Sequence, residues 1–177
     1  MIWYTIYLHV VVSIDLWYIY IYIYIYIFYL AHAGSWMYIG YGCVGARDNK
    51  FKEITYRRTS RFVGAIKLVR RNGHIGCHGG SWTYWGCHVH GLNMLVTDPD
   101  NKILYPSPRL VTFRTGGWYK LPGYTPFSPE LVFSDFGYPK YLKKGDKLRI
   151  WYAEDLYGYT EGDNHGSTCM YIYAYSM

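Results

Sequence analysis

The fold class is decided by residues 148–176, which read LRIWYAEDLYGYTEGDNHGSTCMYIYAYS. Aromatic and β-branched residues, which favour pleated strands, fill the two ends of this stretch, and we expect strands at 148–152 and 168–175. The residues between them include four carboxylates, together with Thr160 and Asn164, and no Lys or Arg. The stretch therefore predicts two β-strands joined by an acidic loop.

The rest of the chain, from residue 47 onward, shows strand-like segments separated by turn signals. Turns are expected at Asn72-Gly73, at residues 98–101 (DPDN) and at residues 143–146 (KKGD), and the first two are predicted to be hairpins. Strands are expected within residues 109–115 and 130–136, whereas the Gly- and Pro-rich residues 116–129 predict a long surface loop. Eight or nine short strands without an amphipathic helix predict an all-β protein, an antiparallel two-sheet β-sandwich of the jelly-roll type.

Composition sets further limits on the class of protein. Of the 177 residues, 51% are hydrophobic, 21% aromatic and only 17% charged, which excludes a disordered chain. The net charge of +6 arises in residues 47–71, where nine Lys and Arg face Asp48 and Glu53. Apolar and basic residues alternate there as on a half-exposed strand pair, which predicts some affinity for polyanions as a side property. No nucleic-acid-binding motif accompanies the cluster, so specific nucleic-acid recognition is not expected.

The first 33 residues differ from the rest of the chain. Residues 16–31 carry no charge, and Ala31-His32-Ala33 fits the small-x-small cleavage pattern of secretory signal peptides. The first interpretation is a leader at 1–33, cleaved after Ala33, followed by one β-sandwich domain at 34–177 in a secreted, extracellular protein. Three alternatives stay open: an uncleaved anchor, which alone predicts membrane contact, a first strand of the domain, and an incorrect start of the gene model.

Four cysteines agree with export, because disulfides form in oxidising compartments. Four cysteines permit three pairings; a local Cys77–Cys87 bridge would leave Cys43 to pair with Cys169. The alternative is a zinc-binding protein, because several potential ligands crowd into seventeen residues: His74, Cys77, His78, Cys87, His88 and His90. Their spacing matches no recognised zinc motif, so disulfides are the expectation.

The acidic loop within residues 154–164 is the leading candidate for a ligand site. Four carboxylates within ten residues repel each other, and a hard cation would relieve that repulsion. Calcium is the cation whose flexible shell of six to eight oxygens suits Asp, Asn, Thr and backbone carbonyls in a loop. The order of the residues is not that of an EF-hand.

A resemblance adds to this argument. An acidic residue at the end of one strand, a short Gly/Thr loop and Asp163-Asn164-x-Gly166 together resemble the calcium-and-sugar loop of the galactose-specific bacterial lectins with a small jelly-roll fold. The resemblance implies four calcium ligands, with the metal also contacting sugar hydroxyls: Asp155, Thr160, Asp163 and Asn164. It is confined to this loop and includes a one-residue length difference before Thr160.

The region from Cys43 onward is also similar to uncharacterised secreted β-sandwich proteins of marine invertebrates, through GSWTYWGC (80–87), DNKILYPS (100–107) and LRIWYAEDL (148–156). This resemblance implies fold and export but no activity. Aromatic faces can stack on a pyranose, and the candidate ligand-binding residues are Glu154, Trp82, Tyr84, Trp85, Trp118 and Tyr119.

No catalytic motif appears in the sequence. The nucleophile elbow, the phosphate-binding loop and the H-E-x-x-H motif are absent, and neighbours such as Glu154 and Asp155 could not easily flank one glycosidic bond. We therefore predict a secreted, non-enzymatic carbohydrate-binding protein that recognises glycans or glycoproteins with calcium through loop 154–164. The alternatives are a structural or adhesive extracellular matrix protein without a defined ligand site, and the zinc-binding protein.

Overall fold

The computed structural model describes residues 16–27, 34–87 and 91–177 and divides the chain into two units, Met1–Gly34 and Ser35–Met177. In the first unit residues 16–27 are helical, so the alternative in which this segment is a first strand of the domain is wrong. Among the described residues, no helix is both long enough and apolar enough to cross a membrane. The predicted cleavage site at residues 31–33 lies outside the described residues.

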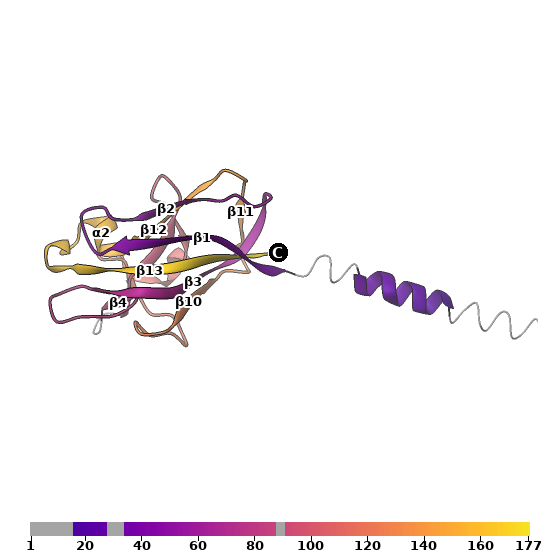
Figure 1. The fold of residues 1–177 in the computed structure, drawn as a ribbon, viewed down its shortest axis with the longest axis horizontal. Helices are drawn as coiled ribbons and strands as arrows, with labels where there is room; N and C mark the ends of the chain where they lie inside the picture. Colours follow the sequence, from indigo (N-terminus) through magenta and orange to yellow (C-terminus); the bar gives the residue numbers. More distant parts are fainter. Residues whose placement is uncertain (1–15, 28–33, 88–90) are drawn as a thin grey trace, which may run out of the picture. The chain divides into compact units, whose positions relative to one another are not determined.

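The second unit is built from antiparallel strands in three sheets (Figure 1). The large sheet consists, in order, of β1 (Ser35–Gly45), β13 (His165–Ser176), β3 (Arg61–Gly76) and β10 (Glu130–Ser134), with β11 (Lys140–Leu142) also paired to β3. The second sheet consists of β2 (Lys52–Thr55), β12 (Lys147–Tyr152), β6 (Met94–Thr97) and β7 (Ile103–Tyr105). The third consists of β4 (Gly86–Cys87), β5 (Gly91–Leu92), β9 (Trp118–Tyr119) and β8 (Val111–Phe113). Three short helices complete the described part of the unit: η1 (Pro108–Leu110), α2 (Ala153–Tyr157) and η2 (Glu161–Asp163).

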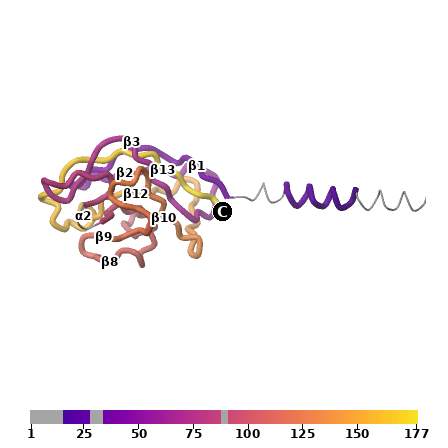
Figure 2. The backbone as a smooth tube through the Cα atoms, turned by 90° about the horizontal axis from the view of Figure 1, so that it is seen from below, coloured from indigo at the N-terminus to yellow at the C-terminus, as the bar shows by residue number. Residues whose placement is uncertain are grey.

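The sheets form two layers around one core. Figure 2 shows β1, β3 and β13 along one face of the unit and β8 and β9 along the opposite face. Burial along β13 alternates, with Met170, Ile172 and Ala174 in the core and tyrosines between them on the outer face, as the period of a strand requires. The layers touch where the Tyr105 hydroxyl of β7 donates a hydrogen bond to the Val63 carbonyl of β3 at 2.7 Å. The predicted antiparallel β-sandwich is confirmed.

The two disulfides that the sequence predicted are present. Cys43 of β1 pairs with Cys169 of β13 across neighbouring strands, in register, and so ties the first strand of the sandwich to the last. Cys77 pairs with Cys87 and closes the loop between β3 and β4. The described part of the chain contains no free cysteine.

Three local predictions are corrected. Asn72 and Gly73 do not turn the chain but lie inside β3, where the register against β13 shifts and Gly73 has a φ of 84°. Residues 51–71 do not form a basic strand pair, because β2 and β3 belong to different sheets. The turn at 98–101 does join the paired strands β6 and β7, whereas the turn at 143–146 passes from one sheet to another. Residues 116–129 are not wholly irregular, since β9 lies among them.

Candidate functional site

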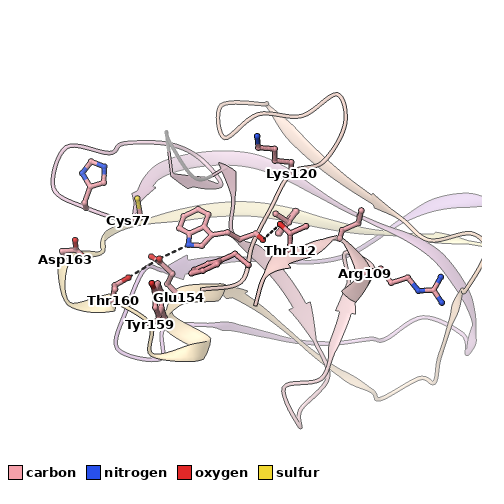
Figure 3. A pocket seen from close by; sticks show the side chains of 13 residues that line it. Cys77, Arg109, Thr112, Lys120, Glu154, Tyr159, Thr160 and Asp163 are labelled. Atoms are coloured by element: carbon pink, nitrogen blue, oxygen red, sulfur yellow. Dashed lines mark hydrogen bonds between the residues drawn. The ribbon is translucent and has the colours of Figure 1, made fainter. Parts of the chain in front are cut away.

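A pocket of about 670 Å³ opens where α2, η2 and β9 meet (Figure 3). Its lining comes from segments far apart in the sequence, because β9 of the third sheet lies beside the end of β12. The residues that give it chemical character are Phe113, Trp118, Tyr119, Lys120, Glu154, Tyr159, Thr160 and Asp163. The pocket therefore combines aromatic walls with a group of oxygen-bearing side chains.

Glu154 forms the floor of the oxygen-bearing end. It follows β12 in the first turn of α2, its backbone N–H donates to Asn93 Oδ1, and only 3% of its surface is exposed. Its Oε1 accepts hydrogen bonds from Trp118 Nε1 at 3.0 Å and from Thr160 Oγ1 at 3.3 Å, both drawn in Figure 3. Burial raises the pKa of this carboxyl above its usual value, and the hydrogen bonds from Trp118 and Thr160 lower the pKa in part.

Two buried oxygens at this place have no hydrogen-bond donor among the described residues. They are Glu154 Oε2 and Asn164 Oδ1. A hydrogen bond from the Asn164 side chain lowers the pKa of Glu154, and Asn164 Nδ2 also donates to the Ala46 carbonyl at 3.1 Å. Because a buried acceptor without a donor is costly, each of these oxygens suits a proton or a bound cation.

Thr160 is held in a conformation that its side chain disfavours. Its φ is 50° and its ψ is 21°, in the left-handed region that β-branched residues rarely adopt. In this conformation the Thr160 hydroxyl donates to Glu154. Asp163, the last residue of η2, also lines the pocket. Such strain is typical of positions fixed by function rather than by folding.

Asp155, the neighbour of Glu154, binds backbone N–H groups of a turn and not the side chains of the pocket. Its Oδ1 accepts the backbone N–H of Asn49 at 2.7 Å and its Oδ2 accepts that of Lys50 at 3.0 Å, so the carboxylate fastens the turn between β1 and β2 to α2. Burial raises its pKa, and the nearby carboxyl of Glu161 raises it further. Asp155 does not line the pocket. Of the four expected calcium ligands, Thr160 and Asp163 line the pocket, Asn164 lies buried behind Glu154, and Asp155 faces another loop.

Only some of the aromatic residues predicted to bind a ligand lie at the pocket. Trp118 and Tyr119 line the pocket, whereas Trp82, Tyr84 and Trp85 do not. Trp85 is fully buried in the core, Tyr84 is covered by the guanidinium of Arg70, and exposed Trp82 contacts the ring of His165.

The sequence did not point to Phe113 or Tyr159. Their rings meet edge to face at 5.5 Å in the wall of the pocket. Tyr159 stands beside Thr160 in the predicted loop and could have been chosen for that reason. Phe113 carried no signal, because an exposed Phe on a predicted strand does not show what it faces.

The zinc alternative involves a group of which two members, Cys77 and His78, line the pocket. The ligating atoms of Cys77, His78 and Cys87 lie within 4.8 Å of one another, but the two sulfurs are joined in a disulfide and cannot act as thiolates. His74 packs on the ring of Tyr84, outside this group. His88 and His90 lie outside the described residues.

A similar fold belongs to a sea anemone lectin. The solved structure is AJLec from the sea anemone Anthopleura japonica, with a TM-score of 0.71 and 29% sequence identity to this chain. The similarity covers 82% of this chain and 99% of the AJLec chain. No protein-family model matches the sequence, and a search of the curated proteins finds no match. The sandwich is thus lectin-like, in agreement with the resemblance to marine invertebrate proteins.

Proposed function

We propose that this protein is a carbohydrate-binding protein of the lectin type, acting outside the cell, and that its sugar site is the pocket around Glu154. The similarity to AJLec over nearly the whole β-sandwich supports the class of function. Two disulfides support an extracellular location. The observation that carries the choice of site is the pair of buried oxygens without donors, Glu154 Oε2 and Asn164 Oδ1, next to an aromatic-walled pocket.

Calcium is the cation that fits these oxygens. Glu154, Thr160, Asp163 and Asn164 offer carboxylate, hydroxyl and amide oxygens from a loop, which is the donor set that calcium accepts. We therefore assign the metal to these four residues and replace Asp155, whose two oxygens already accept backbone N–H groups, by Glu154. Bound calcium would neutralise the carboxylates and present open coordination positions to sugar hydroxyls.

The protein's own residues would then hold and orient the sugar. Trp118 is almost buried and donates from Nε1 to Glu154, so its part is to fix the carboxylate toward the pocket. Phe113, of which 45% is exposed, and Tyr159 offer apolar surface to one face of a pyranose, while the carboxylates at the opposite side accept from its hydroxyls. Galactose is the proposed sugar, on the resemblance of the 154–166 stretch to galactose-specific lectins. Binding and orientation without bond cleavage suffice for this function, so we propose no catalytic role.

A glycan array with and without a chelator tests the proposal. We expect the wild-type protein to bind galactose-terminated glycans in calcium and to lose the signal in EDTA. The double variant Asp163→Ala, Asn164→Ala should bind no glycan, whereas Asp100→Ala, which removes an exposed carboxylate in the β6–β7 turn, should bind as the wild type does. Binding that persists in EDTA would contradict the calcium assignment, and the absence of binding to any glycan would contradict the lectin proposal.

An adhesive role is a second candidate, supported by a different surface. Trp36, Tyr38 and Tyr41 of β1 are 38%, 44% and 41% exposed on the outer face of the large sheet. They contact tyrosines of β13, such as Tyr38 with Tyr173 at 5.7 Å between ring centroids. Such an aromatic face is larger than scattered exposed residues and favours contact with other macromolecules. Substituting Tyr38 and Tyr41 by Ser should reduce adhesion to matrix-coated surfaces without changing glycan binding if both roles exist.

A further inference from the structure

The pocket around Glu154 shares part of its lining with a second cavity. This second cavity, of about 490 Å³, shares Leu110, Tyr119 and Lys120 with the first, so the two adjoin along the end of β9. Its own walls are largely apolar and include Pro122 and Tyr124. A single pyranose at Glu154 would leave this second cavity empty. The two cavities together have the extent of a site for a disaccharide or a longer glycan.

The charges along this groove differ from one end to the other. Glu154 and Asp163 stand at one end, and Lys120 stands where the two cavities join. In Figure 3 the Lys120 side chain lies apart from the group formed by Glu154, Thr160 and Asp163. The lining also includes Arg109, but its guanidinium packs over the ring of Tyr138 at 5.0 Å and points away from the pocket in Figure 3.

Lys120 is therefore a cation available to a ligand. It is exposed, and none of the ion pairs between the described residues involves it. Exposed lysines on a flat surface are ordinary, but this one lines both cavities, together with Tyr119. An ammonium in such a place forms charge-assisted hydrogen bonds with an anionic group and gains little from a neutral hydroxyl.

We propose that the groove binds an acidic oligosaccharide: a terminal sugar at Glu154 and Asp163, and a second residue in the cavity of Tyr124 whose sulfate or carboxylate pairs with Lys120. This inference rests on the proposed lectin function of the same pocket and adds the class of glycan. Sulfate and carboxylate share the chemistry that Lys120 recognises, and the experiment separates them.

Three disaccharides test the proposal by isothermal titration calorimetry in calcium. Each has galactose at its non-reducing end, and the second residue is glucose, glucose 6-sulfate or glucuronic acid. The wild-type protein should bind at least one acidic disaccharide about fivefold more tightly than the neutral one, the upper range for a partly exposed ion pair. The preference should fall as sodium chloride rises from 50 to 500 mM, because salt screens exposed charges.

Variants at Lys120 make the test specific. Lys120→Gln should reduce the ratio of acidic to neutral affinity to about one, and Lys120→Arg should keep it above one. Lys144→Gln removes an exposed lysine from the turn before β12 and should leave all three affinities unchanged. Equal wild-type affinities for the three sugars, or a preference that survives Lys120→Gln, would overturn the inference while leaving the lectin function intact. Failure to bind even the neutral disaccharide would overturn the lectin function and the inference that rests on it.

Discussion

Replacing Glu154 by Gln should have opposite effects on stability with and without calcium. The carboxylate is almost fully buried, and its Oε1 accepts from Trp118 and Thr160 while its Oε2 has no donor among the described residues. Glutamine has the same shape, retains an oxygen for those two donors and places an N–H2 group where Oε2 was. A neutral amide also costs less to bury than a carboxylate whose pKa is raised by burial. In the absence of calcium the variant should therefore be more stable than the wild type.

The size of the gain follows from the unpaired oxygen. Leaving a buried polar atom unsatisfied costs roughly 1 to 3 kcal/mol, so Glu154→Gln should add about 1 to 2 kcal/mol to the free energy of unfolding at pH 7.5. For a unit of this size that corresponds to a rise of about 3 to 6 °C in Tm. Calcium at a hundred times its Kd would stabilise the wild type by about 2.7 kcal/mol. The variant lacks a charged ligand and should gain much less, so the order of the two Tm values reverses in calcium.

The same residue predicts a pH dependence. The pKa of Glu154 is raised in the folded state, so between the unfolded and the folded pKa the native state binds more protons than the unfolded state does. Stability without calcium should therefore fall as pH rises from about 4.5, the value in the unfolded chain, through the folded pKa. Asp155 contributes a change of the same sign, so part of the fall remains in Glu154→Gln. The share due to Glu154 is the difference between the two proteins.

Differential scanning fluorimetry measures both effects. Wild type and Glu154→Gln would be melted from pH 4.5 to 8 in EGTA and, at neutral pH, in calcium. Asp100→Ala serves as the control, because it removes an exposed carboxylate far from the pocket. A variant less stable than the wild type in EGTA at pH 7.5 would contradict the account of the unpaired oxygens. A variant that gains as much Tm from calcium as the wild type would show that Glu154 is not a ligand.

Three further substitutions extend these tests. Asp155→Asn should lower the free energy of unfolding by about 1 to 2 kcal/mol in urea titrations, because the backbone N–H groups of Asn49 and Lys50 lose a charged acceptor. Calcium affinity should not change. Loss of the calcium response in this variant would show that Asp155 is a ligand. Thr160→Gly removes the strain of a positive φ, so the free energy of unfolding should be unchanged or up to about 1 kcal/mol higher. Calcium affinity measured by calorimetry should fall. An unchanged calcium affinity would show that the Thr160 hydroxyl is not a ligand. Trp118→Phe keeps the aromatic wall but removes the Nε1 donor, so the pKa of Glu154 should rise further, and the stability loss that begins near pH 4.5 should continue to higher pH than in the wild type.

Much of the fold was predictable from alternation along the strands. The stretch 168–175 alternates aliphatic and Tyr residues, and β13 buries the first set and turns the second outward, as period two requires. The hairpin turn predicted at Asn72-Gly73 is wrong because the same dipeptide also suits a β-bulge. Only the pairing of the residues before and after it with β13 distinguishes a bulge from a turn. Sequence alone also could not show that β2 and β3 belong to different sheets.

The candidate site was predictable by region but not by residue. Glu154, Thr160 and Asp163 of the acidic loop line one pocket together with Trp118, whereas Asp155 does not. The sequence could not show which of the two neighbouring carboxylates, Glu154 or Asp155, points toward the pocket. That orientation is set by the turn at Asn49 and Lys50, some hundred residues earlier in the chain, whose N–H groups take up Asp155. The residues next to Asp155 in the sequence give no indication of this contact.

In the proposed function, the pocket around Glu154 binds a galactoside with the help of calcium. The most direct measurement is calorimetric titration of lactose into the wild-type protein, first in calcium and then in EDTA. We expect saturable heat with a stoichiometry near one site per chain in calcium, and no binding heat in EDTA. Equal binding in both buffers, or no binding in either, would contradict the proposal.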